Sequence, residues 1–223
     1  MTTSPAMYQE AMAWQHPLVT WAFGAHPADP HALAAAAGLD DRALADHLAH
    51  APVIGEIGLD GTGATTLPQQ RALLSRLLTM LHRTPRPTSL HSRRAVTETV
   101  DALRHAPPGI ILHWWTGGTA ATRAVLDVGC YISVNNTQAR RTAFLGHLPR
   151  DRVLVETDHP YAGSAAPGDV AMTEHALAEA WGISRAQVRH QIWRNFDRLL
   201  TETASHSRQS LLIQQVCEIA RAA

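Results

Sequence analysis

Apolar and polar positions follow two alternating patterns along the chain, and these patterns predict strands and helices in turn. Short apolar runs predict buried strands at 18–24, 53–59, 87–91, 109–113, 130–134 and 152–157. Stretches with helical spacing lie between them, at 31–37, 41–49, 67–82, 93–105, 119–127 and 138–147. Strands that alternate with helices indicate βαβ units and a parallel sheet.

The regularity of this alternation favours a barrel over an open sheet. The predicted fold class is therefore α/β, a TIM-type (β/α) barrel of parallel strands. After residue 158 the pattern changes to a Gly/Ala/Pro loop at 162–168, followed by helices at about 170–181 and 184–200. Ser184 is the expected N-cap of the second helix, with Gln187 in the capping-box position. One further amphipathic helix is expected at about 205–222. Because the sequence has no internal repeat and no low-complexity linker, residues 1–223 are predicted to form a single domain.

Composition and charge exclude several classes of partner. The chain has 223 residues with 19 basic and 19 acidic side chains, so its formal net charge is zero. A polyanionic substrate must therefore be bound by local groups rather than by a global field. The two cysteines, Cys130 and Cys217, are predicted to be reduced thiols of a cytoplasmic protein. No apolar run approaches membrane-spanning length and residues 1–20 do not resemble a signal peptide, so we expect a cytoplasmic location and no membrane partner.

Four of the short apolar runs carry, at or near the C-terminal end, a residue that can bind metal. These residues are Glu56, His91, His113 and Asp158. In a parallel α/β barrel the carboxyl ends of all strands meet on one face, so residues distant in sequence can surround one metal site. Carboxylate and imidazole ligands with an open position for water suit metal-assisted hydrolysis. Each residue alone could be structural, as a turn cap or a packed strand-end histidine, but their common position and order favour a metal site.

Other polar and aromatic residues near these strand ends are candidates for binding substrate. Arg93 and Arg94 could clamp a phosphate, or could simply lie at a solvated helix start. Trp114 and Trp115 could stack on a base, although packing is the more common role of such a residue, so we expect at least one of them to be buried. Tyr161 could orient substrate or pack against the barrel.

Several segments resemble the signature segments of the TatD family. They are GEIGLD at 55–60, LHSR at 90–93, HWWTGG at 113–118 and ETDHPY at 156–161, together with GAHP at 24–27. That family comprises metal-dependent hydrolases with a TIM-barrel fold, many of which are DNases. The resemblance extends over about residues 15–200, so the helix at 205–222 is an addition to it.

The resemblance implies divalent metal ions as cofactors, in a two-metal site. Glu56, a potential bridge between the ions, would bind one ion together with His91 and His113, and Asp158 would serve the other ion and the attacking water. The sequence does not distinguish Mg, Mn and Zn. The segments LHSRRA at 90–95 and GCYISV at 129–134 are most similar to the TatD-like component of Qat anti-phage systems. This similarity implies DNA as substrate and other defence-system proteins as further partners.

The chain departs from the family pattern at its beginning. The family opens with a strand that carries His-x-His, whereas MTTSP at 1–5 resembles the end of the family's second strand. The early histidines His16 and His26 are not expected to replace the two ligands. We expect the first strand to be missing for one of three reasons: a start codon assigned too far downstream, which we favour, a true truncation, or a strand supplied by a partner.

The function predicted from the sequence is a deoxyribonuclease that cleaves DNA phosphodiester bonds with a metal-activated water, in anti-phage defence. One alternative is a catalytically impaired, N-terminally truncated homologue that acts as an accessory subunit. Another is an amide or ester hydrolase of the same superfamily.

Overall fold

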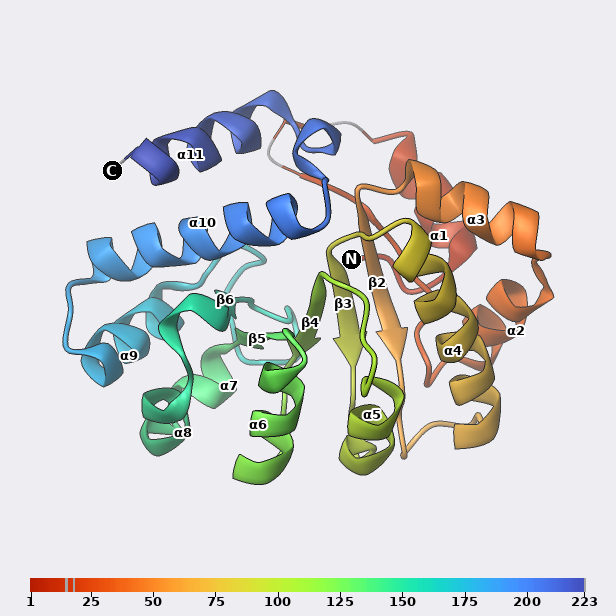
Figure 1. Ribbon diagram of the computed structural model, residues 1–223, viewed down its shortest axis with the longest axis horizontal. Coiled ribbons are helices and arrows are strands. Elements are labelled where there is room, and N and C mark those ends of the chain that lie inside the picture. Colours follow the sequence, from red (N-terminus) through yellow and green to blue (C-terminus); the bar gives the residue numbers. More distant parts are fainter. Residues whose placement is uncertain (15, 18, 223) are drawn as a thin grey trace.

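Six parallel strands form one sheet in the computed structural model, which describes residues 1–14, 16–17 and 19–222. The strands are Ala22–Phe23 (β1), Val53–Gly58 (β2), Thr88–His91 (β3), Ile110–His113 (β4), Tyr131–Val134 (β5) and Val153–Val155 (β6). Their order in the sheet is their order in the chain, β1 to β6, and every neighbouring pair is parallel (Figure 1). The predicted α/β class with parallel strands is confirmed.

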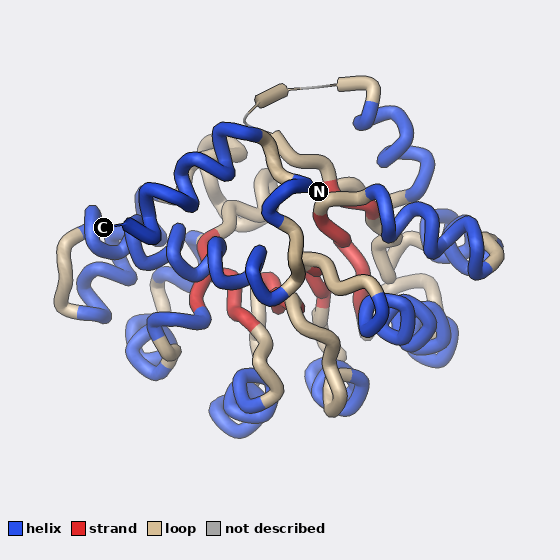
Figure 2. The backbone as a smooth tube through the Cα atoms, turned by 45° about the horizontal axis from the view of Figure 1, so that its top comes forward, coloured by secondary structure: helices blue, strands red, loops and turns tan. Residues whose placement is uncertain are grey.

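Helices cover the outer side of the curved sheet, and Figure 2 shows the strands as an arc inside a layer of helices. The helices are Pro5–Met12 (α1), Pro30–Gly38 (α2), Asp41–His50 (α3), Leu67–Arg83 (α4), Val96–Ala102 (α5), Thr119–Asp127 (α6), Asn136–Ala139 (α7), Thr142–His147 (α8), Ala171–Trp181 (α9), Arg185–Glu202 (α10) and Leu211–Ala222 (α11). Two short 3-10 helices, Arg150–Arg152 and His206–Arg208, precede β6 and α11. None of the helices in the described part of the chain is long and apolar enough to cross a membrane.

Four predicted elements are corrected by the structure. The strand predicted at 18–24 is reduced to β1, and its first residue, Leu18, lies outside the described residues. The helix predicted at 93–105 begins only at Val96, because Arg94 has a φ of 49°, which is incompatible with a right-handed helix.

The helix predicted at 138–147 is divided in two. Asn135 caps the short α7 by accepting hydrogen bonds from the backbone N–H groups of Thr137 and Gln138, so that helix begins before the predicted position. The helix predicted at 205–222 begins at Leu211, because Gln209 is extended. The backbone oxygen of Ser210 then accepts the first helical hydrogen bond of α11, from Gln214.

The carboxyl ends of β2 and β3 approach each other closely, and this contact determines the geometry of the site. Gly58 pairs with His91 across the two strands and has a φ of 139°. A Cβ atom at Gly58 would lie only 2.2 Å from the backbone oxygen of His91. A residue with a side chain could not occupy this position without moving the strands apart.

The last two helices, α10 and α11, are connected through one buried carboxylate, that of Asp197. Ser184 and Gln187 form the predicted capping box at the start of α10. In α10, Asp197 contacts His206 Nε2 at 2.7 Å and Arg221 Nε at 3.0 Å, and these ion pairs fasten α11 to the body of the protein.

Candidate metal centre

Three residues from neighbouring strands and one from a turn meet at the carboxyl edge of the sheet. Glu56 lies in β2, His91 ends β3 and His113 ends β4. His26 joins them from the turn that follows β1. Because parallel strands place their carboxyl ends on one edge, three of the four residues predicted as metal ligands come together here.

One carboxylate oxygen is the centre of the cluster. Glu56 Oε1 lies 2.6 Å from His91 Nδ1, 3.1 Å from His113 Nε2 and 3.2 Å from His26 Nε2. The Glu56 side chain is 14% exposed and that of His113 only 8%. A largely buried carboxylate is thus surrounded by three imidazoles.

The electrostatics of the cluster favour the charged forms of Glu56 and His113. Burial raises the pKa of Glu56, but hydrogen bonds from His113, His26 and His91 outweigh burial and hold this pKa well below its ordinary range. Burial lowers the pKa of His113, but the hydrogen bond and the charge of Glu56 outweigh it and raise this pKa. The two groups therefore form a buried ion pair in the metal-free protein.

The outer nitrogen of each strand-end histidine also has a partner. His91 Nε2 lies 2.7 Å from Asp60 Oδ2, and His113 Nδ1 lies 3.2 Å from the hydroxyl of Ser89. Both contacts leave the opposite nitrogen, Nδ1 of His91 and Nε2 of His113, facing Glu56. These two nitrogens and the Glu56 carboxylate can serve as a set of metal ligands.

His26 is oriented differently from the other two imidazoles. The backbone N–H of Ala28 donates to His26 Nδ1 at 3.2 Å, so Nδ1 must offer a lone pair. In the neutral ring the hydrogen is then on Nε2, which faces Glu56 at 3.2 Å. In this tautomer His26 is a hydrogen-bond donor to the cluster and cannot bind a metal through Nε2. No role at this site was predicted for His26. The spacing of apolar and polar residues does not show where a turn residue lies relative to the end of a neighbouring strand.

Asp158, the fourth predicted ligand, lies after β6, with a left-handed φ of 43°. Burial raises the pKa of its carboxyl, and the negative charge of Glu56 raises it further, while His113, His91 and His26 oppose these effects. Asp158 is therefore close enough to the cluster to feel its charges, although no hydrogen bond joins it to them among the described residues.

A second, half-buried carboxylate, Glu156, ties together the ends of three strands. Its Oε1 accepts hydrogen bonds from the backbone N–H of Trp114 at 2.8 Å and from Asn135 Nδ2 at 3.1 Å. Its Oε2 accepts from the hydroxyl of Ser133 at 2.6 Å. Trp114 follows β4 with a φ of 41°, so this contact holds a strained residue next to His113.

The residues predicted to bind substrate follow the carboxyl ends of the strands, the rim of the site, and differ in solvent exposure. Arg93 and Arg94 are exposed, Trp114 is half-buried and Tyr161 is 79% exposed. Because of its exposure, Tyr161 does not have the packing role considered as an alternative. Trp115 is fully buried and its Nε1 donates to the hydroxyl of Thr122, so the expectation that one of the two tryptophans packs inside is confirmed.

The chemistry of the donor set fits a divalent cation. One ligand atom from each of His26, Glu56 and His91 can be chosen so that the three lie within 4.8 Å of one another. Carboxylate and imidazole donors in such a cluster suit divalent cations, Zn²⁺ among them. The tautomer of His26 makes His113 a better third ligand than His26.

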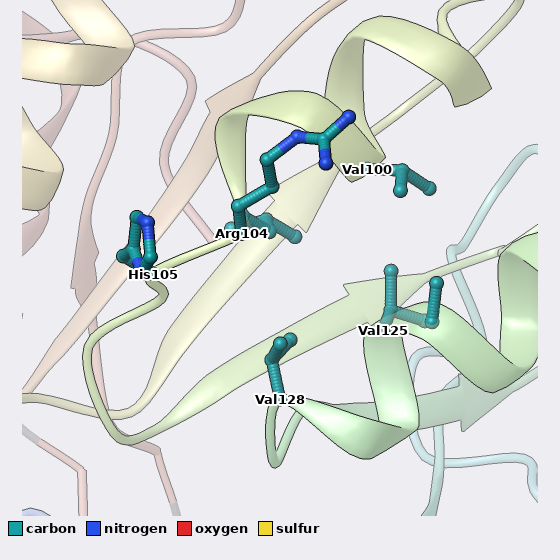
Figure 3. Close-up of a pocket in the computed structure, with 7 residues that line it drawn as sticks. Val100, Arg104, His105, Val125 and Val128 are labelled. Atoms are coloured by element: carbon teal, nitrogen blue, oxygen red, sulfur yellow. The ribbon is translucent and has the colours of Figure 1, made fainter.

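A separate hollow of about 400 Å³ lies between α5 and α6 (Figure 3). It is lined mainly by apolar side chains, including Val100, Val125 and Val128, with Arg104 and His105 at its side. It contains none of the residues predicted for the site. It belongs to the outer helix layer, whereas the chemical groups gather at the carboxyl edge of the sheet.

Comparison with known proteins is consistent with this arrangement. Residues 2–201 match the model of the TatD related DNase family. A curated relative, the 3'-5' ssDNA/RNA exonuclease TatD of Edwardsiella piscicida, is 33% identical over 161 residues, which are 67% of this chain and 62% of that protein. The uncharacterized metal-dependent hydrolase TatD of Mycobacterium tuberculosis is 31% identical over 174 residues, 69% of this chain and 66% of that protein. The chain thus spans just under two thirds of the length of these curated relatives.

Among solved structures, a TatD homologue from Escherichia coli K12 is similar to this chain with a TM-score of 0.73. The sequences are 22% identical, and the match covers 89% of this chain and 83% of the other. At this level of identity the similarity concerns the fold, and it agrees with the parallel sheet and its layer of helices.

Proposed function

Because the chain belongs to the TatD related DNase family of metal-dependent hydrolases, we propose that it hydrolyses the phosphodiester bonds of DNA at the Glu56 cluster. The observation that carries this proposal is the contact of one oxygen of a largely buried carboxylate with three imidazoles at the carboxyl edge of a parallel sheet. This edge is where parallel α/β barrels hold their catalytic groups.

In this proposal Glu56, His91 Nδ1 and His113 Nε2 hold a divalent cation. When bound, the cation supplies Lewis acidity that activates water and stabilises charge on the phosphoryl oxygens. Asp158 accepts the proton of the attacking water on its carboxylate. A role of Asp158 at a second cation also belongs to this proposal.

We further propose single-stranded DNA as the substrate, since a relative bears the name of a 3'-5' ssDNA/RNA exonuclease. The exposed guanidinium groups of Arg93 and Arg94 supply local positive charge for phosphates, which a chain of zero net charge requires. The half-buried Trp114 and the exposed Tyr161 offer aromatic faces on which bases can stack. A role in anti-phage defence stays a prediction from the sequence.

The test is cleavage of end-labelled single-stranded DNA with added Mg²⁺, Mn²⁺ or Zn²⁺ by the wild type, by Glu56→Gln and by Asp158→Asn. Glu56→Gln keeps the size of the side chain and removes its charge, so we expect the rate to fall at least about 100-fold. Glu218→Gln, an exposed change on α11, is the matched control and should cleave like the wild type.

Three outcomes would reject the proposed function. Equal cleavage by the wild type and Glu56→Gln would show that activity does not come from this cluster. Hydrolysis of amide or ester substrates without cleavage of DNA would favour the other hydrolase class. An absence of all hydrolysis would favour an accessory role.

A further inference from the structure

A buried carboxylate outside the predicted ligand set contacts the metal-binding histidine of β3. Asp60 follows β2 and is 2% exposed. Its Oδ2 lies 2.7 Å from Nε2 of His91, the nitrogen that faces away from Glu56. His91 is thus placed between two carboxylates, with Glu56 on Nδ1 at 2.6 Å and Asp60 on Nε2.

The position of Asp60 is set by contacts independent of His91. Its Oδ1 accepts from the hydroxyl of Thr62 at 2.5 Å and from the backbone N–H of Thr62 at 2.7 Å. Its backbone N–H donates to Gln70 Oε1 at 2.7 Å, and its backbone oxygen accepts from Gln70 Nε2 at 3.0 Å. Thr62 and Gln70 therefore hold the loop so that Oδ2 remains directed at the imidazole.

The contact has a chemical consequence for the ring. Oδ1 of Asp60 already accepts the hydroxyl and the backbone N–H of Thr62, and a carboxylate can only accept hydrogen bonds, so Oδ2 is an acceptor directed at His91 Nε2. His91 must then carry a hydrogen on Nε2. With that hydrogen fixed on Nε2, Nδ1 is the nitrogen that can exchange the hydrogen it donates to Glu56 for a bond to a cation.

We propose that Asp60 is a positioning residue of the metal centre, which holds hydrogen on Nε2 of His91 and so directs the Nδ1 lone pair to the cation beside Glu56. This inference rests on the metal-binding part of the proposed function. It assigns to Asp60 an effect on cation affinity through His91, with no contact to the cation or the substrate.

A merely structural role for Asp60 makes a different prediction. A carboxylate that only stabilised its loop would affect folding stability and leave the tautomer of His91 and the cation affinity unchanged. The chain contains a matched pair for comparison, since Asp197 contacts His206 Nε2 at 2.7 Å and is also buried, but belongs to α10. Asp197→Asn removes the same kind of contact in a helix that contributes no residue to the Glu56 cluster.

The first measurement uses the wild type alone. Nitrogen-15 NMR correlation of the imidazole nitrogens with ring protons, in the Zn²⁺-loaded protein, reports which nitrogen carries hydrogen. We expect His91 to carry it on Nε2 with Nδ1 bound to Zn²⁺. A hydrogen on Nδ1 of His91 in the loaded protein overturns the proposal without any variant.

The second measurement is the affinity for Zn²⁺, by competition with a chromophoric chelator. Asp60→Asn should weaken binding by about 10- to 100-fold, because the amide can donate to Nε2 and favour the wrong tautomer. Asp197→Asn should bind Zn²⁺ within about threefold of the wild type, even where its melting temperature falls. Equal affinity of Asp60→Asn and the wild type overturns the proposal.

Failure of this inference and failure of the proposed function are distinguishable. Zn²⁺ binding with the expected tautomer but without cleavage of DNA rejects only the nuclease proposal. Cleavage of DNA by a Zn²⁺-loaded protein with unchanged affinity in Asp60→Asn rejects only the role of Asp60. An absence of Zn²⁺ binding by the wild type overturns the role of Asp60, and cleavage with Mg²⁺ or Mn²⁺ then decides the nuclease proposal.

Discussion

At the scale of single residues, the site depends on the direction of each imidazole nitrogen. Glu56 Oε1 receives three histidines, but the partners behind them differ: a carboxylate behind His91, a hydroxyl behind His113 and a backbone N–H behind His26. The first two partners can accept hydrogen from the ring, whereas the third can only donate. His91 and His113 can therefore bind a cation through the nitrogen that faces Glu56, whereas His26 can only donate a hydrogen bond there. The similar distances of the three rings from Glu56 do not reveal this difference.

His26 provides a direct test of this separation. We expect His26→Gln to bind Zn²⁺ within about threefold of the wild type, since glutamine can still donate to Glu56. His91→Gln should lose about 100-fold or more in affinity, because it removes a ligand. Isothermal titration of both variants with Zn²⁺ checks the prediction, and a comparable loss in both would make His26 a ligand.

The ion pair of Glu56 and His113 should make the metal-free protein less stable at high pH. The pKa of His113 is raised to about 9 by Glu56, against about 6.5 for the unfolded chain. The folded protein therefore binds the extra proton, and its stabilising effect is complete below about pH 6.5 and lost as the pH rises through about 9. The loss should be on the order of 1–3 kcal/mol in the free energy of unfolding.

Urea unfolding of the chelator-treated protein at several pH values measures this loss. The control is His113→Gln, which has no proton to lose and should show a smaller decline over the same range. An identical decline in the variant would mean that other groups account for the pH dependence.

At the scale of elements, the sequence pattern was most informative where an apolar run ended in a polar residue. The strand predicted at 109–113 forms β4 over Ile110–His113, since a run of β-branched and leucine residues is followed by a tight turn. The pattern failed where local capping decided the outcome, as in the divided helix at 138–147. It also missed α1, although Ser4 before Pro5 is a helix-start signal that could have identified it.

The substitution Gly58→Ala tests whether the site requires the close approach of β2 and β3. Gly58→Ala would bring a methyl group against the backbone of His91, so the strands must separate and the contact of His91 with Glu56 must lengthen. We expect the free energy of unfolding to fall by about 2 kcal/mol or more and Zn²⁺ affinity to fall with it.

The control is Gly129→Ala, where φ is also positive, at 89°, but no atom lies within 4 Å of the added methyl. Because only backbone strain is added, this substitution should lower the free energy of unfolding by about 1 kcal/mol and leave Zn²⁺ affinity unchanged. Thermal unfolding and Zn²⁺ titration distinguish the two. Equal effects would mean that strain, not the approach of the strands, matters at Gly58.

At the scale of the whole molecule, parallel topology explains which parts of the site could be predicted. Glu56, His91 and His113 end or lie near the ends of successive strands, so the strand pattern alone brings them together; their roles as ligands stay predictions. His26 and Asp60 could not be placed in the same way, because they act through loop conformations that strand periodicity does not encode. The single-domain organisation also stays a prediction.

The reactivity of the two buried cysteines measures whether the protein is folded. Burial raises the pKa of Cys130 to about 12 and that of Cys217 to about 11, so both thiols are almost fully protonated near pH 8. We expect Ellman's reagent to label neither at an appreciable rate in the native protein and both after denaturation. Rapid native labelling, with a rate that rises about tenfold per pH unit, would reveal an accessible thiolate instead.

The contacts of Glu156 have a practical consequence for engineering the rim. One carboxylate secures the segments that follow β4 and β5 as well as its own, so these segments do not vary independently. A combinatorial library that randomises the surrounding loops should keep Glu156, Ser133 and Asn135 constant and place its diversity beyond them. A variant that loses the Glu156 contacts would displace Trp114 and with it His113. It would then lose activity even if its loops recognised a new substrate.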